Sequence, residues 1–182
     1  MTLARWRKLS ETAVARNPRW SYMRDSFELP SGTIREYHYV RTNGSAMVVA
    51  TLGDGRVLAV RQYRYLLERD SVEFPCGAVR DGESYEEAAR HELAEETGQG
   101  AGRLVFVGRF NPYNGMTDEM CHVYLAADLS PVVATPDETE EFELVPLTSW
   151  QIEASIRDGT IWDGMTIAAW HMVRLRLEGA PL

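Results

Sequence analysis

The chain has 182 residues, a formal net charge of −8, 45% hydrophobic residues and 25% charged residues. This length allows one domain with a sizeable core, and the composition is that of a folded globular protein. The negative charge argues against a protein that coats nucleic acid, because the phosphate backbone attracts clustered Lys and Arg. A negative chain can still bind an anionic ligand through a metal ion or a local group of arginines.

The cysteines and the absence of long apolar runs favour a cytoplasmic location. Cys76 and Cys121 are the two cysteines, and such scattered residues are more typical of reduced core cysteines than of a disulfide. Residues 1–19 carry basic side chains but no apolar run, and no stretch of the sequence approaches the roughly 20 apolar residues that span a bilayer.

Two hairpins are predicted in the first third of the chain. Ser21–Leu29 and Thr33–Val40 flank a Pro-Ser-Gly turn, and their strands are only half apolar, so we expect them at an edge or against a partner. Ala46–Leu52 and Val57–Gln62 are apolar runs joined by Gly-Asp-Gly, which is a strong hairpin signal.

A helix is predicted over Ser84–Thr97. Ser84 and Glu87 form a capping box, and Gly98 follows the helix at a position that tolerates positive φ. Strands alternate with helices along the rest of the chain, which predicts an α/β sandwich around a mixed sheet. The other predicted strands are Val72–Phe74, Leu104–Phe110, Cys121–Ala127 and Phe142–Pro146, and the closing helices are Thr148–Arg157 and Met165–Leu177.

Three glutamates of the predicted helix indicate a metal site. Glu92, Glu95 and Glu96 are spaced i, i+3, i+4, so they lie on one helix face, where their charges repel. A hard divalent cation with oxygen ligands relieves this repulsion. On the triplet alone, a solvated acidic face is the commoner explanation.

The residues around the triplet change this balance. Gly77, then Glu83, then the run from His91 to Gly98 match the Nudix box at the right spacing. That family pattern is Gly, five residues, Glu, seven residues, then Arg-Glu-aliphatic-any-Glu-Glu-any-Gly-aliphatic. The chain therefore resembles the Nudix hydrolases, which implies a Nudix α/β/α sandwich and Mg²⁺-dependent cleavage of a diphosphate, with Mn²⁺ as a possible substitute.

Two positions depart from the pattern. His91 stands where the family has an Arg that pairs with the box glutamates, and Gln99 replaces the final aliphatic residue. Histidine can still donate a hydrogen bond, but it lacks the forked geometry and the fixed charge of arginine. We expect the first departure to affect metal affinity and rate, and the second to remove only a packing contact.

The resemblance also implies roles for the box residues. Glu92 and Glu96 would be Mg²⁺ ligands, together with the backbone carbonyl of Cys76. Glu95 would bind a second ion or act as a base for water, and Glu83 would orient the helix face.

Motifs outside the box resemble the ADP-ribose pyrophosphatase and nucleoside diphosphate sugar hydrolase branch. They are Val60–Tyr65, then Glu73–Gly77, then the loop Asn111–Glu119. The resemblance implies diphosphate contacts from Arg64 or Arg61, which strand alternation places on opposite faces, so we expect one of them to serve.

Two further roles follow from the same resemblance. Glu73 would accept a hydrogen bond from the base or the sugar of the substrate. Glu119 would be the general base on a loop that closes over substrate, with Asp118 as the alternative.

The resemblance implies two parts of the chain, an N-terminal antiparallel segment over 1–44 that packs across a homodimer and a Nudix domain over 45–182. Trp6, Trp20, Tyr22 and Phe27 suit an interface, although local packing explains them too. The expected substrate is ADP-ribose, cleaved to a nucleoside monophosphate and a sugar phosphate. The alternatives are a nucleoside diphosphate sugar such as GDP-mannose or a UDP-sugar, and a nucleotide-binding regulatory module with little turnover.

Overall fold

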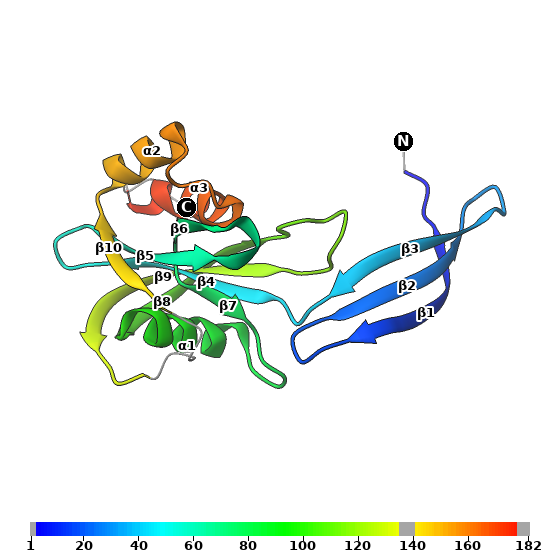
Figure 1. Ribbon diagram of the computed structural model, residues 1–182, viewed down its shortest axis with the longest axis horizontal. Coiled ribbons are helices and arrows are strands. Elements are labelled where there is room, and N and C mark those ends of the chain that lie inside the picture. The colour runs from blue at the N-terminus through cyan, green and yellow to red at the C-terminus, as the bar shows by residue number, and fades with distance from the viewer. Residues whose placement is uncertain (1–2, 135–140, 178–182) are drawn as a thin grey trace.

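A small antiparallel sheet projects from a larger α/β body in the computed structural model, which describes residues 3–134 and 141–177 (Figure 1). The small sheet contains β1 (Arg7–Arg16), β2 (Ser21–Glu28) and β3 (Ile34–Arg41) in the order β1-β2-β3. The predicted hairpin is confirmed as β2 and β3. Strand β1 was not predicted, because it is exposed along nearly its whole length and lacks the apolar alternation of a half-buried strand.

The body is built on a seven-stranded mixed sheet. Its main path runs β10-β5-β4-β9-β8, with β6 paired to β5 and β7 paired to β4. Strands β4 and β9 are parallel and the other pairs are antiparallel, as expected for a mixed sheet. The strands are β4 (Ser45–Thr51), β5 (Val57–Arg64), β6 (Arg69–Glu73), β7 (Cys76–Ala78), β8 (Gln99–Phe110), β9 (Cys121–Pro131) and β10 (Glu143–Leu147).

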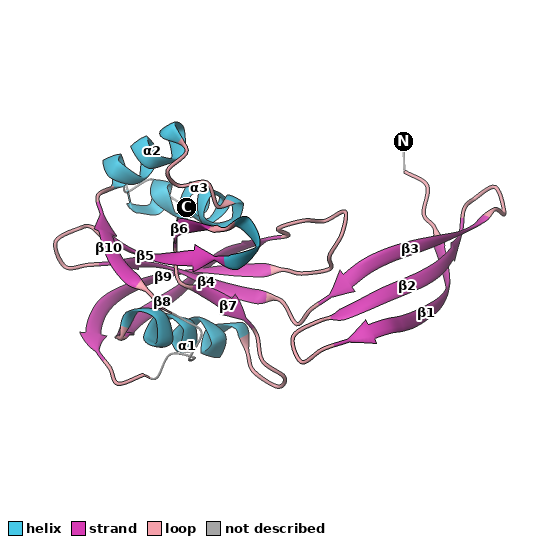
Figure 2. Ribbon diagram, in the orientation of Figure 1, coloured by secondary structure: helices cyan, strands magenta, loops and turns pink. Residues whose placement is uncertain are grey.

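Helices cover both faces of this sheet. Helix α1 (Tyr85–Thr97) lies on one face, whereas α2 (Ser149–Asp158) and α3 (Gly164–Leu177) lie on the other (Figure 2). The predicted α/β/α sandwich is therefore confirmed. No helix in the described ranges is long and apolar enough to cross a membrane.

Strand β4 divides the core into two layers because its side chains alternate between the two faces. Met47 and Val49 belong to the cluster that includes Trp170 of α3. Ala46 and Val48 belong to the cluster that packs under α1. All four of these β4 side chains are buried, and β7, which carries the first glycine of the box, pairs with this buried strand.

Candidate active site

Helix α1 presents the box glutamates because both of its ends are fixed. The Ser84 side chain accepts a hydrogen bond from the backbone N–H of Glu87, and the Glu87 carboxylate accepts one from the backbone N–H of Ser84. Gly98 ends the helix in the left-handed region, at φ 65°. Both predicted caps are confirmed, and they satisfy backbone groups at the two ends of the helix that carries the acidic face.

Strand β7 brings its backbone directly against this acidic face. A Cβ atom on Gly77 would lie 2.2 Å from Cδ and from Oε1 of Glu92, so only glycine leaves room for that carboxylate. The backbone N–H of Cys76 donates to Oε1 of Glu96 at 3.3 Å. The structure thus brings Cys76, Gly77, Glu92 and Glu96 together, although the two parts of the box lie far apart in sequence.

These groups line a polar cavity of about 610 Å³. Three glutamates from α1 and three arginines from separate elements share it, so the cavity pairs a metal-type oxygen cluster with donors suited to phosphate oxygens. The described lining residues are Pro18, Arg19, Asn43, Gln62, Arg64, Cys76, Gly77, Ala78, Val79, Arg80, Asp81, Glu92, Glu95, Glu96 and Phe142.

The oxygen donors of this cavity fit a magnesium ion. Among the described residues, no three His, Cys, Asp or Glu side chains form a ready-made metal cage. Mg²⁺ does not need one, because it keeps several waters and uses one or two carboxylates together with substrate oxygens. Glu92 against the Gly77 backbone and the buried Glu96 against the Cys76 backbone match that requirement.

Cys76 offers the site its backbone rather than its thiol. The pKa of this thiol is raised well above its usual value by a hydrogen bond with the Cys121 thiol and by desolvation. The thiol is therefore neutral near pH 7, and the carbonyl is the group through which Cys76 could bind a hard cation.

Arg64 and Arg61 occupy different environments, in agreement with strand alternation. Arg64 lines the cavity, and its Nε donates to Oε1 of Glu73 at 2.8 Å while its Nη2 contacts Oε2. The nearly buried Glu73 carboxylate raises the pKa of the Arg64 guanidinium. Arg61 is instead paired with Glu143 and is not among the described lining residues.

His91 and Arg80 hold different members of the box. His91 Nδ1 lies 2.5 Å from Oε1 of Glu83, whose Oε2 accepts the backbone N–H of Arg80 at 2.9 Å. The Arg80 side chain reaches the helix, where Nη2 donates to both oxygens of Glu95 at 3.0 Å. This ion pair raises the pKa of the Arg80 guanidinium. Sequence reasoning missed Arg80, and the signal available was a basic residue within the acidic box loop.

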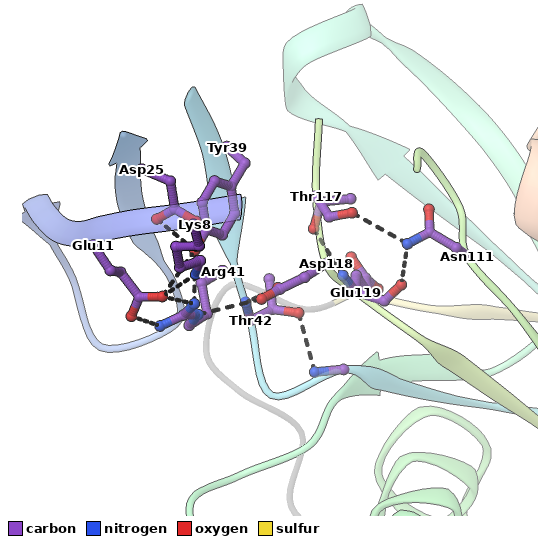
Figure 3. Close-up of polar contacts among 11 residues, drawn as sticks. Lys8, Glu11, Asp25, Tyr39, Arg41, Thr42, Asn111, Thr117, Asp118 and Glu119 are labelled. Atoms are coloured by element: carbon purple, nitrogen blue, oxygen red, sulfur yellow. Dashed lines mark hydrogen bonds and ion pairs between the residues drawn. The ribbon is translucent and has the colours of Figure 1, made fainter. Parts of the chain in front are cut away.

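The loop that carries Glu119 is attached to the small sheet. Val40 of β3 exchanges backbone hydrogen bonds with Met116 and Asp118, at 2.8 and 3.2 Å. The Asp118 carboxylate accepts from the backbone N–H of Thr42 at 3.1 Å and from Arg41 Nε at 3.3 Å (Figure 3).

Glu119 itself lies outside the cavity. Its Oε1 accepts the hydroxyl of Ser45 at 2.6 Å. Neither Glu119 nor Asp118 is among the described residues that line the cavity. The structure therefore does not bring Glu119 together with the box glutamates.

Comparison with known proteins identifies the family. The model of the NUDIX domain matches residues 41–161. The ADP-ribose pyrophosphatase of Bacillus subtilis is 32% identical over 93% of this chain and 96% of its own length. The methanol dehydrogenase activator of Bacillus methanolicus is 33% identical over 84% of this chain and 83% of its own length.

A solved structure of an ADP compounds hydrolase superimposes with a TM-score of 0.87 at 26% identity, covering 98% of this chain and 97% of the other. The chain belongs to the Nudix family. The prediction of a Nudix pyrophosphohydrolase is confirmed at that level.

Proposed function

We propose that this protein hydrolyses the diphosphate of ADP-ribose, or of a nucleoside diphosphate sugar, with Mg²⁺ or Mn²⁺ as cofactor. The products are a nucleoside monophosphate and a sugar phosphate. The observation that carries the proposal is the convergence of Glu92 and Glu96 on the β7 backbone inside an arginine-bearing cavity. The similarity to a protein named ADP-ribose pyrophosphatase over nearly the whole chain supports the substrate class.

In this proposal Glu92, Glu96 and the Cys76 carbonyl hold the ion. When bound, such an ion supplies a hydroxide nucleophile near neutral pH and neutralises charge on the diphosphate. Glu83 keeps the box loop against the helix through His91 and the backbone of Arg80. The Glu92 carboxylate can lie against β7 only because Gly77 has no side chain, so the motif needs glycine at position 77 for steric reasons.

Arg64 is the proposed diphosphate ligand. It lines the cavity, and Glu73 takes up its Nε and Nη2 but not its Nη1, whereas Arg61 is paired with Glu143 and is not among the described lining residues. Because both carboxylate oxygens of Glu73 already contact Arg64, we assign Glu73 the task of orienting that guanidinium rather than of meeting the base or the sugar.

Glu119 remains the proposed general base, in preference to Asp118. The Asp118 carboxylate is engaged by Arg41 and by the backbone of Thr42, so it ties the loop to the small sheet. Glu119 is held by the hydroxyl of Ser45, which is a lighter restraint. The loop must move for Glu119 to reach substrate, as loops over active sites commonly do.

The deciding experiment is an incubation with Mg²⁺ and four compounds separately: ADP-ribose, GDP-mannose, UDP-glucose and a nucleoside triphosphate. Products are identified by chromatography. We expect AMP and ribose 5-phosphate from ADP-ribose, or the matching pair from one of the sugar nucleotides. Preference for the triphosphate would contradict the substrate class.

A regulatory module with little turnover is the second candidate. His91 at the usual arginine position and the similarity to a protein named methanol dehydrogenase activator favour it. The retained geometry of Glu83, Glu92, Glu95 and Glu96 favours turnover. Binding of these nucleotides without hydrolysis at high protein concentration would establish the regulatory function instead.

Assembly and location complete the proposal. We propose that the segment 1–44 forms a homodimer interface next to the Nudix domain over 45–182, and that the protein is cytoplasmic. Phe27 stacks on Trp6, and Tyr22 stacks on His38, so both pack within the small sheet. Trp6 and Trp20 nevertheless remain 55% and 44% exposed. Exposed aromatic rings of this kind support an interface. Light scattering after gel filtration should give twice the monomer mass of 20.6 kDa.

A further inference from the structure

Arg80 is fixed at both its backbone and its side chain. Its backbone N–H donates to the Glu83 carboxylate, which fixes the backbone of Arg80 in the loop between β7 and α1. Its Nη2 then bridges the two carboxylate oxygens of Glu95 at equal distances of 3.0 Å. Both partners line the cavity. The first contact lies within the loop, and the second joins the loop to the helix face.

This contact supplies the fixed positive charge that the residue at position 91 lacks. The hydrogen bond of His91 goes to Glu83, and an imidazole has neither the fixed charge nor the fork of a guanidinium. Glu95 lies three residues after Glu92 and next to Glu96 on a face crowded with negative charge. A guanidinium on Glu95 lowers that repulsion and fixes the direction of the carboxylate.

We propose that Arg80 is a positioning residue that holds Glu95 away from the metal, so that Glu92 and Glu96 are the only glutamates of the helix that bind the ion. The assignment follows from the division of the helix face: Glu92 and Glu96 meet the β7 backbone, whereas Glu95 turns to the Arg80 guanidinium. Mg²⁺ sheds its waters reluctantly. A carboxylate that is paired with arginine would have to give up that partner as well as displace a water, so it competes poorly for a coordination position on the ion.

An ordinary surface ion pair is the contrasting explanation. The Arg80 and Glu95 side chains are 59% and 26% exposed, and exposed pairs contribute little to stability. The chain contains a matched control for this case on the same helix. Arg90 pairs with Glu86 at 3.0 Å, with side chains that are 42% and 57% exposed, and neither residue lines the cavity.

The first test measures Mn²⁺ binding by electron paramagnetic resonance, without substrate. It compares the wild type, Arg80→Gln, Glu95→Gln and the double variant. We expect Glu95→Gln to leave the dissociation constant nearly unchanged when Arg80 is present. In the Arg80→Gln background the same change should weaken binding by about tenfold or more, because Glu95 has by then been recruited to the ion.

Loss of the Arg80 positive charge by itself changes Mn²⁺ affinity. That effect cancels when the double variant is compared with Arg80→Gln, because both proteins lack Arg80. Equal effects of Glu95→Gln in the two backgrounds would overturn the proposal. A large loss of Mn²⁺ affinity from Glu95→Gln alone would overturn it too, because Glu95 would then be a ligand in the wild type. This test does not depend on turnover, so it stays valid if the proposed hydrolysis fails.

The second test is kinetic and rests on the proposed function. Arg80→Gln should lower kcat by roughly 10- to 100-fold while KM changes little. Arg80→Lys should retain most of the wild-type kcat, because lysine keeps a positive charge that can pair with Glu95. Arg90→Gln should keep wild-type kinetics. A loss confined to KM, or a loss of kcat in Arg80→Lys as large as in Arg80→Gln, would show that Arg80 does not act through the charge of Glu95.

Discussion

The replacement Gly77→Ala tests how closely the β7 backbone must approach the metal face. The added Cβ would lie 2.2 Å from Cδ and Oε1 of Glu92 and 2.4 Å from Oε2. Ordinary contact begins near 3.4 Å, so the carboxylate must retreat by about 1.2 Å, from 2.2 to 3.4 Å. A catalytic group displaced by about 1 Å can cost roughly 10²-fold in rate, so we expect kcat to fall by about that factor.

The same structure predicts little loss of stability in this variant. The obstructing atoms are the flexible end of one side chain, and Gly77 does not need a left-handed backbone. The assay is Mg²⁺-dependent turnover together with thermal unfolding. Gly53→Ala is the control, because nothing lies within 4 Å of its added Cβ. Wild-type turnover in Gly77→Ala would refute the steric argument. A fall in kcat that is accompanied by a matching fall in the unfolding midpoint would refute it too.

Three further predictions concern the loop, the box and the small sheet. Glu119→Gln should lower kcat by roughly 10²- to 10⁴-fold, as expected for a lost general base, and by more than Asp118→Asn; the opposite order in steady-state kinetics would reverse the assignment. His91→Arg in the otherwise wild-type chain should maintain or raise turnover, and a large loss would reveal a specific role for the imidazole. Hydrogen bonds from Arg41, and to a smaller extent from Lys8, lower the pKa of Glu11 from 4.5 to about 2. The stabilisation that the ionised Glu11 gives to the small sheet is therefore present above pH 4.5 and is lost as the pH falls toward 2. The protection factors of the β1 amides against hydrogen exchange, corrected for the intrinsic exchange rate at each pH, should therefore fall as the pH is lowered across that window, and fall less in Glu11→Gln; an identical pH response in both proteins would contradict this.

Local signals in the sequence were enough to predict α1 and its acidic face. The capping box at Ser84 and the glycine at 98 act within a few residues of themselves, so no tertiary information is needed to read them. The alternation along β5 likewise predicted that Arg61 and Arg64 face opposite ways, as they do. Each of these inferences depends on residues close together in sequence: within about one helical turn for the caps and the acidic face, and within a few residues of one strand for the two arginines.

Elements without such a repeat were missed. Strand β1 has no buried side chain to mark a face, and its strand form depends on pairing with β2. Strand β7 spans only Cys76–Ala78 and is defined by its place beside β4.

The contact of Arg80 with Glu95 was beyond sequence reasoning for a similar reason. It joins a loop residue to a helix residue that lies 15 positions further along the chain. Which carboxylate the guanidinium reaches depends on the path of that loop, which Glu83 sets through the Arg80 backbone. A basic residue inside the box could be noticed in the sequence, but its partner could not.

The most direct test of the central claim is Glu96→Gln. Glu96 is 7% exposed and binds the β7 backbone, and the substitution keeps its size while it removes the charge that a divalent cation needs. With the preferred diphosphate substrate and Mg²⁺, the variant should lose turnover while its unfolding midpoint stays close to that of the wild type. Near-wild-type turnover in this variant would show that the acidic face of α1 is not the metal site.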